Sequence, residues 1–127
     1  MSKSPGHQAQ PEHKVEEKPV MQTVQVVVNG ERVATSRGVI AVDEDGNPRR
    51  LYFPRSDVKM EKFERSTTTS YCPFKGTARY FNLNVGGKTL KDVVWTYEDP
   101  YDEHLGLKDR VAFWPEKARE IQILQAT

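Results

Sequence analysis

Turn-forming residues divide the chain into short segments of strand character, and this punctuation limits the folds open to it. Valines at every second position over residues 24–28 give the two-residue period of a half-buried strand. Asn29-Gly30 follows directly, the strongest short signal for a two-residue hairpin turn. No strand is followed by the helix-length pattern that a parallel sheet requires. The sequence therefore predicts a mainly β, antiparallel domain.

Eight strands are expected, and they lie at residues 24–28, 31–36, 39–42, 51–53, 67–71, 77–85, 88–97 and 111–114. Helical turns are expected near residues 56–58 and 102–109. Ala118, Ile121 and Leu124 are three residues apart, which favours a short C-terminal helix within residues 116–126. This number of strands predicts a sheet arrangement closed enough to hide most edges.

The N-terminal segment contains little to bury. Residues 1–12 hold Pro5, Gly6 and Pro11 among polar residues, so a disordered tail is predicted there. Residues 13–20 either extend the tail or dock through Val15 and Val20. Residues 21–127 are predicted to form a single domain, since 127 residues leave room for only one.

Charge and cysteine content exclude several functional classes. The 19 basic and 18 acidic residues give a net charge of +1 and interleave along the chain, so nonspecific nucleic-acid binding is not expected. A single cysteine cannot form an intramolecular disulfide and favours a reducing compartment. With no membrane-length apolar run and no signal peptide, the prediction is a cytoplasmic protein without membrane association.

No metal or cofactor is expected from the sequence. The three histidines are His7, His13 and His104, and their spacing does not form a compact set of ligands. The oligomeric state does not follow from the sequence.

The longest expected hairpin turns at Gly86-Gly87, which places Leu83 opposite Leu90. One face then holds Phe81, Leu83 and Val85, and the other holds Ala78, Tyr80, Val93, Trp95 and Tyr97. In this register Tyr80 faces Val93, Ala78 faces Trp95, and Phe81 faces Asp92. The last pair is unfavourable, so a bulge near Lys91-Asp92 is predicted. The aromatic face is either a second core layer or the wall of a pocket.

The segment from Cys72 to Lys75 combines the only thiol with a lysine across a turn marked by Pro73 and Gly76. A thiolate is reactive where a cation lowers its pKa, and Lys75 or Arg55 could supply that charge. The alternative is a small buried hydrophobic residue. Lys75 and Arg55 are also candidates for an anion site, or are surface charges.

Four motifs together closely resemble the domain of unknown function 427 family, also labelled nucleotidyltransferase-like. They are FPRSDV at 53–58, TSYCPFKGTARY at 69–80, VWTYEDP at 94–100 and VAFWP at 111–115. The resemblance covers about residues 13–115 and implies a β-tent fold, similar to methionine sulfoxide reductases of the R type. It implies no established activity, and many members carry histidine where this chain has Tyr71.

Three hypotheses follow for function. The first is a small-molecule binding domain for an anionic or nucleotide-like ligand. Its candidate residues are Cys72 and Lys75 as chemical groups, with Arg55, Tyr52, Tyr80, Trp95 and Tyr97 binding the ligand. The second is an enzyme using Cys72 as nucleophile or redox thiol, or with the transferase activity of the family label. The third is a structural or interaction domain.

Overall fold

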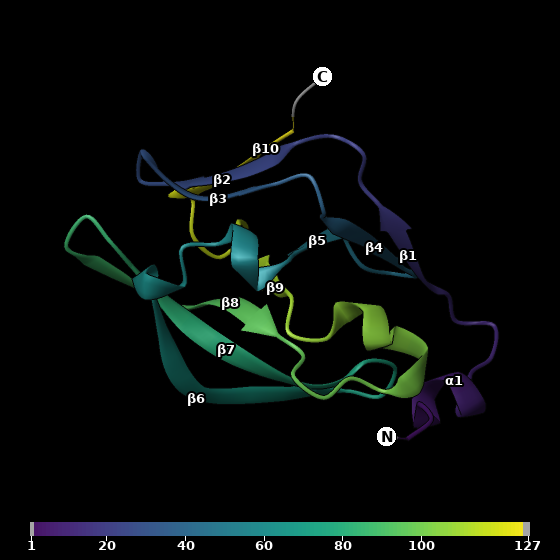
Figure 1. Cartoon of the computed structure of the whole chain (residues 1–127). Helices are drawn as coiled ribbons and strands as arrows, with labels where there is room; N and C mark the ends of the chain where they lie inside the picture. Colours follow the sequence, from purple (N-terminus) through teal and green to yellow (C-terminus); the bar gives the residue numbers. More distant parts are fainter. Residues whose placement is uncertain (1, 126–127) are drawn as a thin grey trace.

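Two antiparallel sheets make up most of the chain in the computed structural model, which describes residues 2–125. The elements are α1 (Pro5–Ala9), β1 (Val15–Pro19), β2 (Val24–Val28), β3 (Glu31–Ser36), β4 (Ile40–Glu44), β5 (Arg50–Phe53), η1 (Arg55–Asp57), η2 (Met60–Lys62), β6 (Phe63–Cys72), β7 (Gly76–Val85), β8 (Lys88–Thr96), η3 (Asp102–Leu107), β9 (Val111–Phe113) and β10 (Ile121–Gln125). One sheet has the order β1-β4-β5-β9-β8-β7-β6 and the other the order β10-β2-β3 (Figure 1). The prediction of a mainly antiparallel β domain is confirmed.

The predicted C-terminal helix is wrong. Residues 121–125 form strand β10, which pairs antiparallel with β2 and places Ile121 opposite Val28 and Ile123 opposite Val26. The three-residue spacing of apolar side chains suggested a helix, but Leu124 is half exposed and contributes no buried stripe. The free edge of β2 offers a row of backbone partners, and this tertiary pairing decides the conformation.

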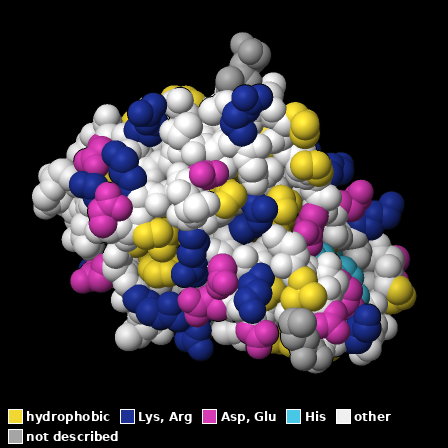
Figure 2. Space-filling model, in the orientation of Figure 1, with side chains coloured by type: hydrophobic (Ala, Val, Ile, Leu, Met, Phe, Trp, Pro, Cys, Tyr) yellow, Lys and Arg dark blue, Asp and Glu magenta, His cyan; other side chains and the backbone are white. Residues whose placement is uncertain are grey.

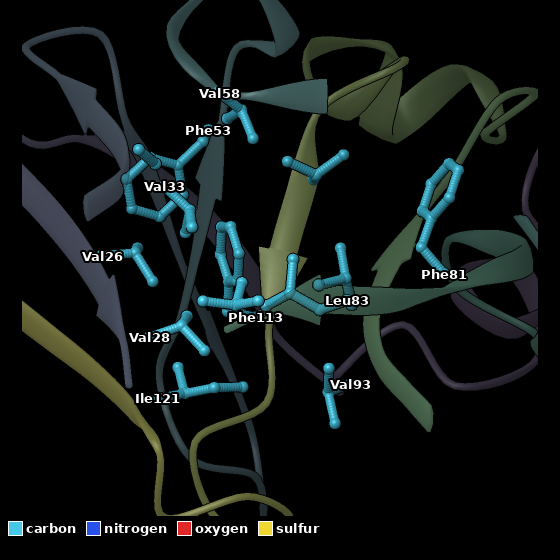
Figure 3. Packing of buried hydrophobic residues seen from close by; sticks show 14 of the residues in the cluster. Val26, Val28, Val33, Phe53, Val58, Phe81, Leu83, Val93, Phe113 and Ile121 are labelled. Carbon is cyan, nitrogen blue, oxygen red and sulfur yellow. The ribbon is translucent and has the colours of Figure 1, made fainter. Parts of the chain in front are cut away.

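The inter-sheet core is the cluster of buried side chains between the two sheets (Figure 3). Val26, Val28 and Ile121 of the small sheet meet Phe53 and Phe113 of the large sheet, whose rings pack edge to face at 5.6 Å. The hairpin from β2 to β3 turns at Asn29 and Gly30, both with positive φ, as predicted for this dipeptide.

The opposite face of the large sheet carries a second cluster, because successive residues of a strand point to opposite sides. Phe53 enters the inter-sheet core while its neighbour Tyr52 does not, and Val94 and Trp95 divide in the same way. We call this second set the site-face cluster; its buried members are Val42, Tyr52, Ala78, Trp95, Tyr97, Leu107 and Ala112. These residues form the floor on which the candidate site is built.

The hairpin from β7 to β8 contains the predicted irregularity. Leu83 pairs with Leu90, and the register then shifts so that Phe81 pairs with Val94 and Tyr80 with Trp95. Asp92 has a φ of 54° at the shift, and its N–H donates to Asn82 Oδ1 at 3.0 Å.

Two pairings and one face assignment expected along this hairpin beyond the shift are wrong. Tyr80 does not face Val93, Ala78 does not face Trp95, and Val93 joins the inter-sheet core. The shift moves the partners by two residues, so Trp95 and Tyr97 keep the side that alternation predicts.

The N-terminal segment, for which the sequence predicts a disordered tail over 1–12, contains α1 from Pro5 to Ala9 in its described part. The Gly6 N–H and the Ser4 hydroxyl both donate to the Pro73 carbonyl, at 2.9 and 2.8 Å. Residues 15–19 form β1, paired antiparallel with β4. Polar contacts to the turn after β6 thus hold a segment that has few apolar residues.

Charged side chains of both signs intermingle on the face shown in Figure 2. Ion pairs join charged side chains of the protein, such as Arg49 with Asp43 at 2.7 Å and Arg65 with Glu98 at 2.7 Å. The surface therefore agrees with the interleaved charge pattern of the sequence.

Candidate functional site

A pocket of about 200 Å³ opens on the site-face cluster. Its walls come from β4 and β5, from the end of the turn before β7, from β7 and β8, and from the residue after β9. The lining residues are Val42, Glu44, Asn47, Pro48, Arg50, Tyr52, Lys75, Tyr80, Trp95, Tyr97 and Trp114. Four of the aromatic residues that the sequence singles out, and Lys75, lie together here.

Lys75 is the most enclosed cation of the pocket. It lies at the end of the turn between β6 and β7, where Cys72 pairs with Gly76. Gly76 has a φ of 121°, a conformation that favours glycine and turns the chain directly into β7. Only 7% of Lys75 is exposed, and its ammonium donates to Glu44.

The Lys75 ammonium has three N–H donors, and Glu44 is its one hydrogen-bond acceptor among residues 2–125. A buried cation with unused donors is costly unless solvent or a ligand accepts from it. The remaining donors can therefore serve water or any hydrogen-bond acceptor that enters the pocket.

Glu44 ends β4 and faces the same pocket. His13 Nε2 lies 3.1 Å from its carboxylate. Burial acts to raise the pKa of Glu44, but Lys75 and His13 together hold that pKa below its ordinary value. The carboxylate is thus ionised at neutral pH and fixes the position of the ammonium.

Aromatic rings form most of the remaining wall. The Trp95 indole N–H donates to the Tyr52 hydroxyl at 3.0 Å, and Trp114 packs edge to face on Trp95 at 6.0 Å. Burial raises the pKa of both Tyr52 and Tyr97 well above the ordinary value, so both phenols keep their protons. Within residues 2–125 the Tyr97 hydroxyl makes no hydrogen bond. Both phenols can therefore donate to a ligand.

The sequence reasoning missed three charged or aromatic residues of the pocket: Glu44, Arg50 and Trp114. The Arg50 guanidinium lies 5.5 Å from the centre of the Trp95 ring and donates to Glu116 at 2.7 Å. Alternation could have found two of the three. Arg50 is two residues from Tyr52, and Glu44 is two residues from Val42, so each shares a face with a buried site-face residue.

Arg55 lies away from the pocket. It follows β5 in η1, and its guanidinium is 5.7 Å from the Phe81 ring, on the inter-sheet side of the large sheet. There it donates to the Asp109 carbonyl at 2.6 Å and to Thr96 Oγ1 at 3.1 Å. The structure thus separates Arg55 from Lys75, with which the sequence reasoning grouped it.

Cys72 is half buried and packs against the site-face cluster, but it does not line the pocket. Although Lys75 follows Cys72 by only three positions, its ammonium donates to Glu44. The hydroxyl of Tyr71, the residue before Cys72, forms a hydrogen bond of 2.7 Å with the Tyr101 hydroxyl.

The N-terminal segment covers the outside of the Lys75 turn. His13 stacks on Phe74 with ring centres 4.2 Å apart, and His7 packs edge-on against the same ring at 5.0 Å. His7 Nε2 lies 2.8 Å from His104 Nε2, and His104 Nδ1 lies 2.6 Å from Glu17. Burial, followed by the charge of His104, lowers the pKa of His7 from its ordinary value. The segment thus touches both Phe74 and Glu44, the neighbours of Lys75.

Together, these features define a mainly antiparallel β domain with a small aromatic pocket that holds a buried lysine. Residues 16–123 match the family described as domain of unknown function (DUF427), and the chain belongs to that family. No curated protein matches the chain. Across residues 2–125, no helix is long and apolar enough to cross a membrane, and no group of three or more His, Cys, Asp or Glu side chains is arranged to hold a metal ion.

Proposed function

We propose that this protein binds a small molecule that has an anionic group and a planar part. The observation that carries the proposal is the Lys75 ammonium, 7% exposed, within a wall of aromatic rings and with donors left over after its bond to Glu44. An apolar pocket with a few convergent polar groups is the usual form of a ligand site. The anionic group would accept from Lys75 and the phenols, and the planar part would lie against Trp95 and Trp114.

A thermal-shift panel tests this proposal. Benzoate, citrate, AMP and ATP serve as probes, since a ligand at 100 times its Kd stabilises the folded state by about 2.7 kcal/mol. At least one probe is expected to raise the Tm of the wild type and to have little effect on Lys75→Met. Lys88→Met is the matched control, because Lys88 also pairs with a glutamate, Glu120, but on the exposed surface. If no probe raises the Tm, the proposal fails.

The alternative function is thiol chemistry at Cys72, and probe binding to a Cys72 variant can test it. Because Cys72 lies outside the pocket lining, Cys72→Ser is expected to bind the probes as the wild type does. Rapid alkylation of Cys72 that a bound probe blocks would instead favour an enzyme. The β-tent assignment, the cytoplasmic location and the nucleotidyltransferase label stay predictions.

A further inference from the structure

The volume and charge of the pocket restrict the ligand class further, and this inference rests on the proposed function. We propose that the ligand is a single-ring aromatic carboxylate, bound with its carboxylate at Lys75 and its ring against the tryptophans. Three properties of the pocket carry this inference, namely its volume, its net charge and the depth at which its polar groups lie.

The volume admits one ring. Pockets for drug-sized ligands typically enclose about 300–1,000 Å³, whereas a cavity of about 150 Å³ accommodates benzene in a well-studied engineered protein. The present pocket, at about 200 Å³, has room for such a ring and one small substituent. A nucleotide would extend far outside it.

The charges favour a single negative charge on the ligand. The lining holds two positive charges, Lys75 and Arg50, against one negative charge, Glu44, and Glu116 just outside the lining brings the balance close to zero. Arg50 is already paired with Glu116. A triphosphate would bring several negative charges close to the Glu44 carboxylate, and like charges in a partly buried site repel strongly. One carboxylate can accept from the free donors of Lys75 with far less of that repulsion.

The depth of the polar groups gives the ligand a direction. The side chain of Lys75 is 8% exposed and that of Arg50 is 22% exposed, so the less shielded cation lies nearer the opening. Tyr52 and Tyr97 are only 1% and 5% exposed, and their hydroxyl protons have no acceptor among the described residues. Two oxygens of a carboxylate can accept from the ammonium and one phenol together, a better match than a neutral amide offers.

The indole N–H signals of the protein provide a direct assay. Both tryptophans of the chain, Trp95 and Trp114, line the pocket, so each of the two indole signals in a ¹H–¹⁵N spectrum reports on it. Benzoate, benzamide, acetate, AMP and ATP are titrated into the full-length protein, and Trp114→Phe assigns the signals. Benzoate is expected to shift both signals, with a Kd at least about 10-fold lower than that of benzamide, acetate or ATP.

The outcomes separate this inference from the proposed function. If AMP or ATP binds more tightly than benzoate, or if benzamide equals benzoate, the single-ring carboxylate is refuted while a binding pocket stands. If no probe shifts either signal, the binding function itself is refuted. Tyr97→Phe offers a second measurement that keeps Lys75 intact: it removes one donor to the carboxylate and is expected to weaken benzoate and acetate several-fold alike, whereas unchanged benzoate binding would overturn the placement of the carboxylate beside this phenol.

Discussion

Replacing Lys75 with methionine should destabilise the fold, because it leaves the Glu44 carboxylate enclosed without its main cation. Removing one partner of a buried ion pair costs about 3–5 kcal/mol. The side chain of Glu44 is 14% exposed and keeps His13 at 3.1 Å, so solvent and the imidazole offset part of this cost. We therefore expect a loss of about 2–3 kcal/mol.

Urea unfolding followed by circular dichroism measures this loss, with Lys88→Met as the control. Lys88 pairs with Glu120 but is 58% exposed, so its replacement should change stability by less than about 1 kcal/mol. The reasoning also requires coupling. In the double variant Lys75→Met/Glu44→Gln no unpaired charge remains, so its loss should fall short of the sum of the single losses by about 1–2 kcal/mol. A stable Lys75→Met protein, or strictly additive losses, would refute this account of the pair.

Three further predictions concern the core, the turn and pH. Leu83→Ala should cost about 3–5 kcal/mol in urea unfolding, because Leu83 is fully buried, whereas Leu124→Ala at a half-exposed position should cost below about 1 kcal/mol. Gly76→Ala should cost about 1–3 kcal/mol in urea unfolding, because Gly76 has a φ of 121° and an added Cβ would lie 3.3 Å from the Asp99 carbonyl oxygen. Gly87→Ala should cost less, since a Cβ at Gly87 would meet open space. Equal losses for the two variants would contradict this reasoning. Because the pKa of His7 is lowered in the folded protein, the unfolded chain binds a proton at His7 more readily. The contribution of neutral His7 to the free energy of unfolding is therefore complete above the unfolded pKa of about 6.5 and is lost as the pH falls through the pKa of the folded protein. His7→Gln should flatten the stability curve between about pH 7 and 5, and an unchanged slope would show that His7 does not titrate as described.

Local signals were sufficient for the parts of the fold that neighbouring residues determine. Alternation and turn chemistry predicted most strands, the Asn29-Gly30 hairpin and the irregularity at Asp92. They failed for residues 121–125, where the free edge of β2, distant in sequence, imposes strand geometry. The same local reasoning does not reveal that 31–36 and 40–44 belong to different sheets.

For the candidate site, alternation grouped the residues of one hairpin but could not join separate strands. Tyr80, Trp95 and Tyr97 lie in one pocket because they share a hairpin face. Glu44 and Arg50 arrive from β4 and β5, whose place in the sheet depends on pairing across β9. Arg55 was grouped with Lys75 on chemistry alone, and the position of η1 on the other side of the sheet separates them.

Strand β6 is the outermost strand of the large sheet, and its irregular pairing bears on association between molecules. A ten-residue outermost strand would ordinarily recruit a neighbouring molecule through its free backbone groups. Here the ladder to β7 breaks between Arg65 and Thr69, leaving regular stretches of only three and four residues. Mutations that restore regular pairing across this interruption, or that replace its threonines with larger apolar side chains, should cause the molecules to associate without altering the pocket.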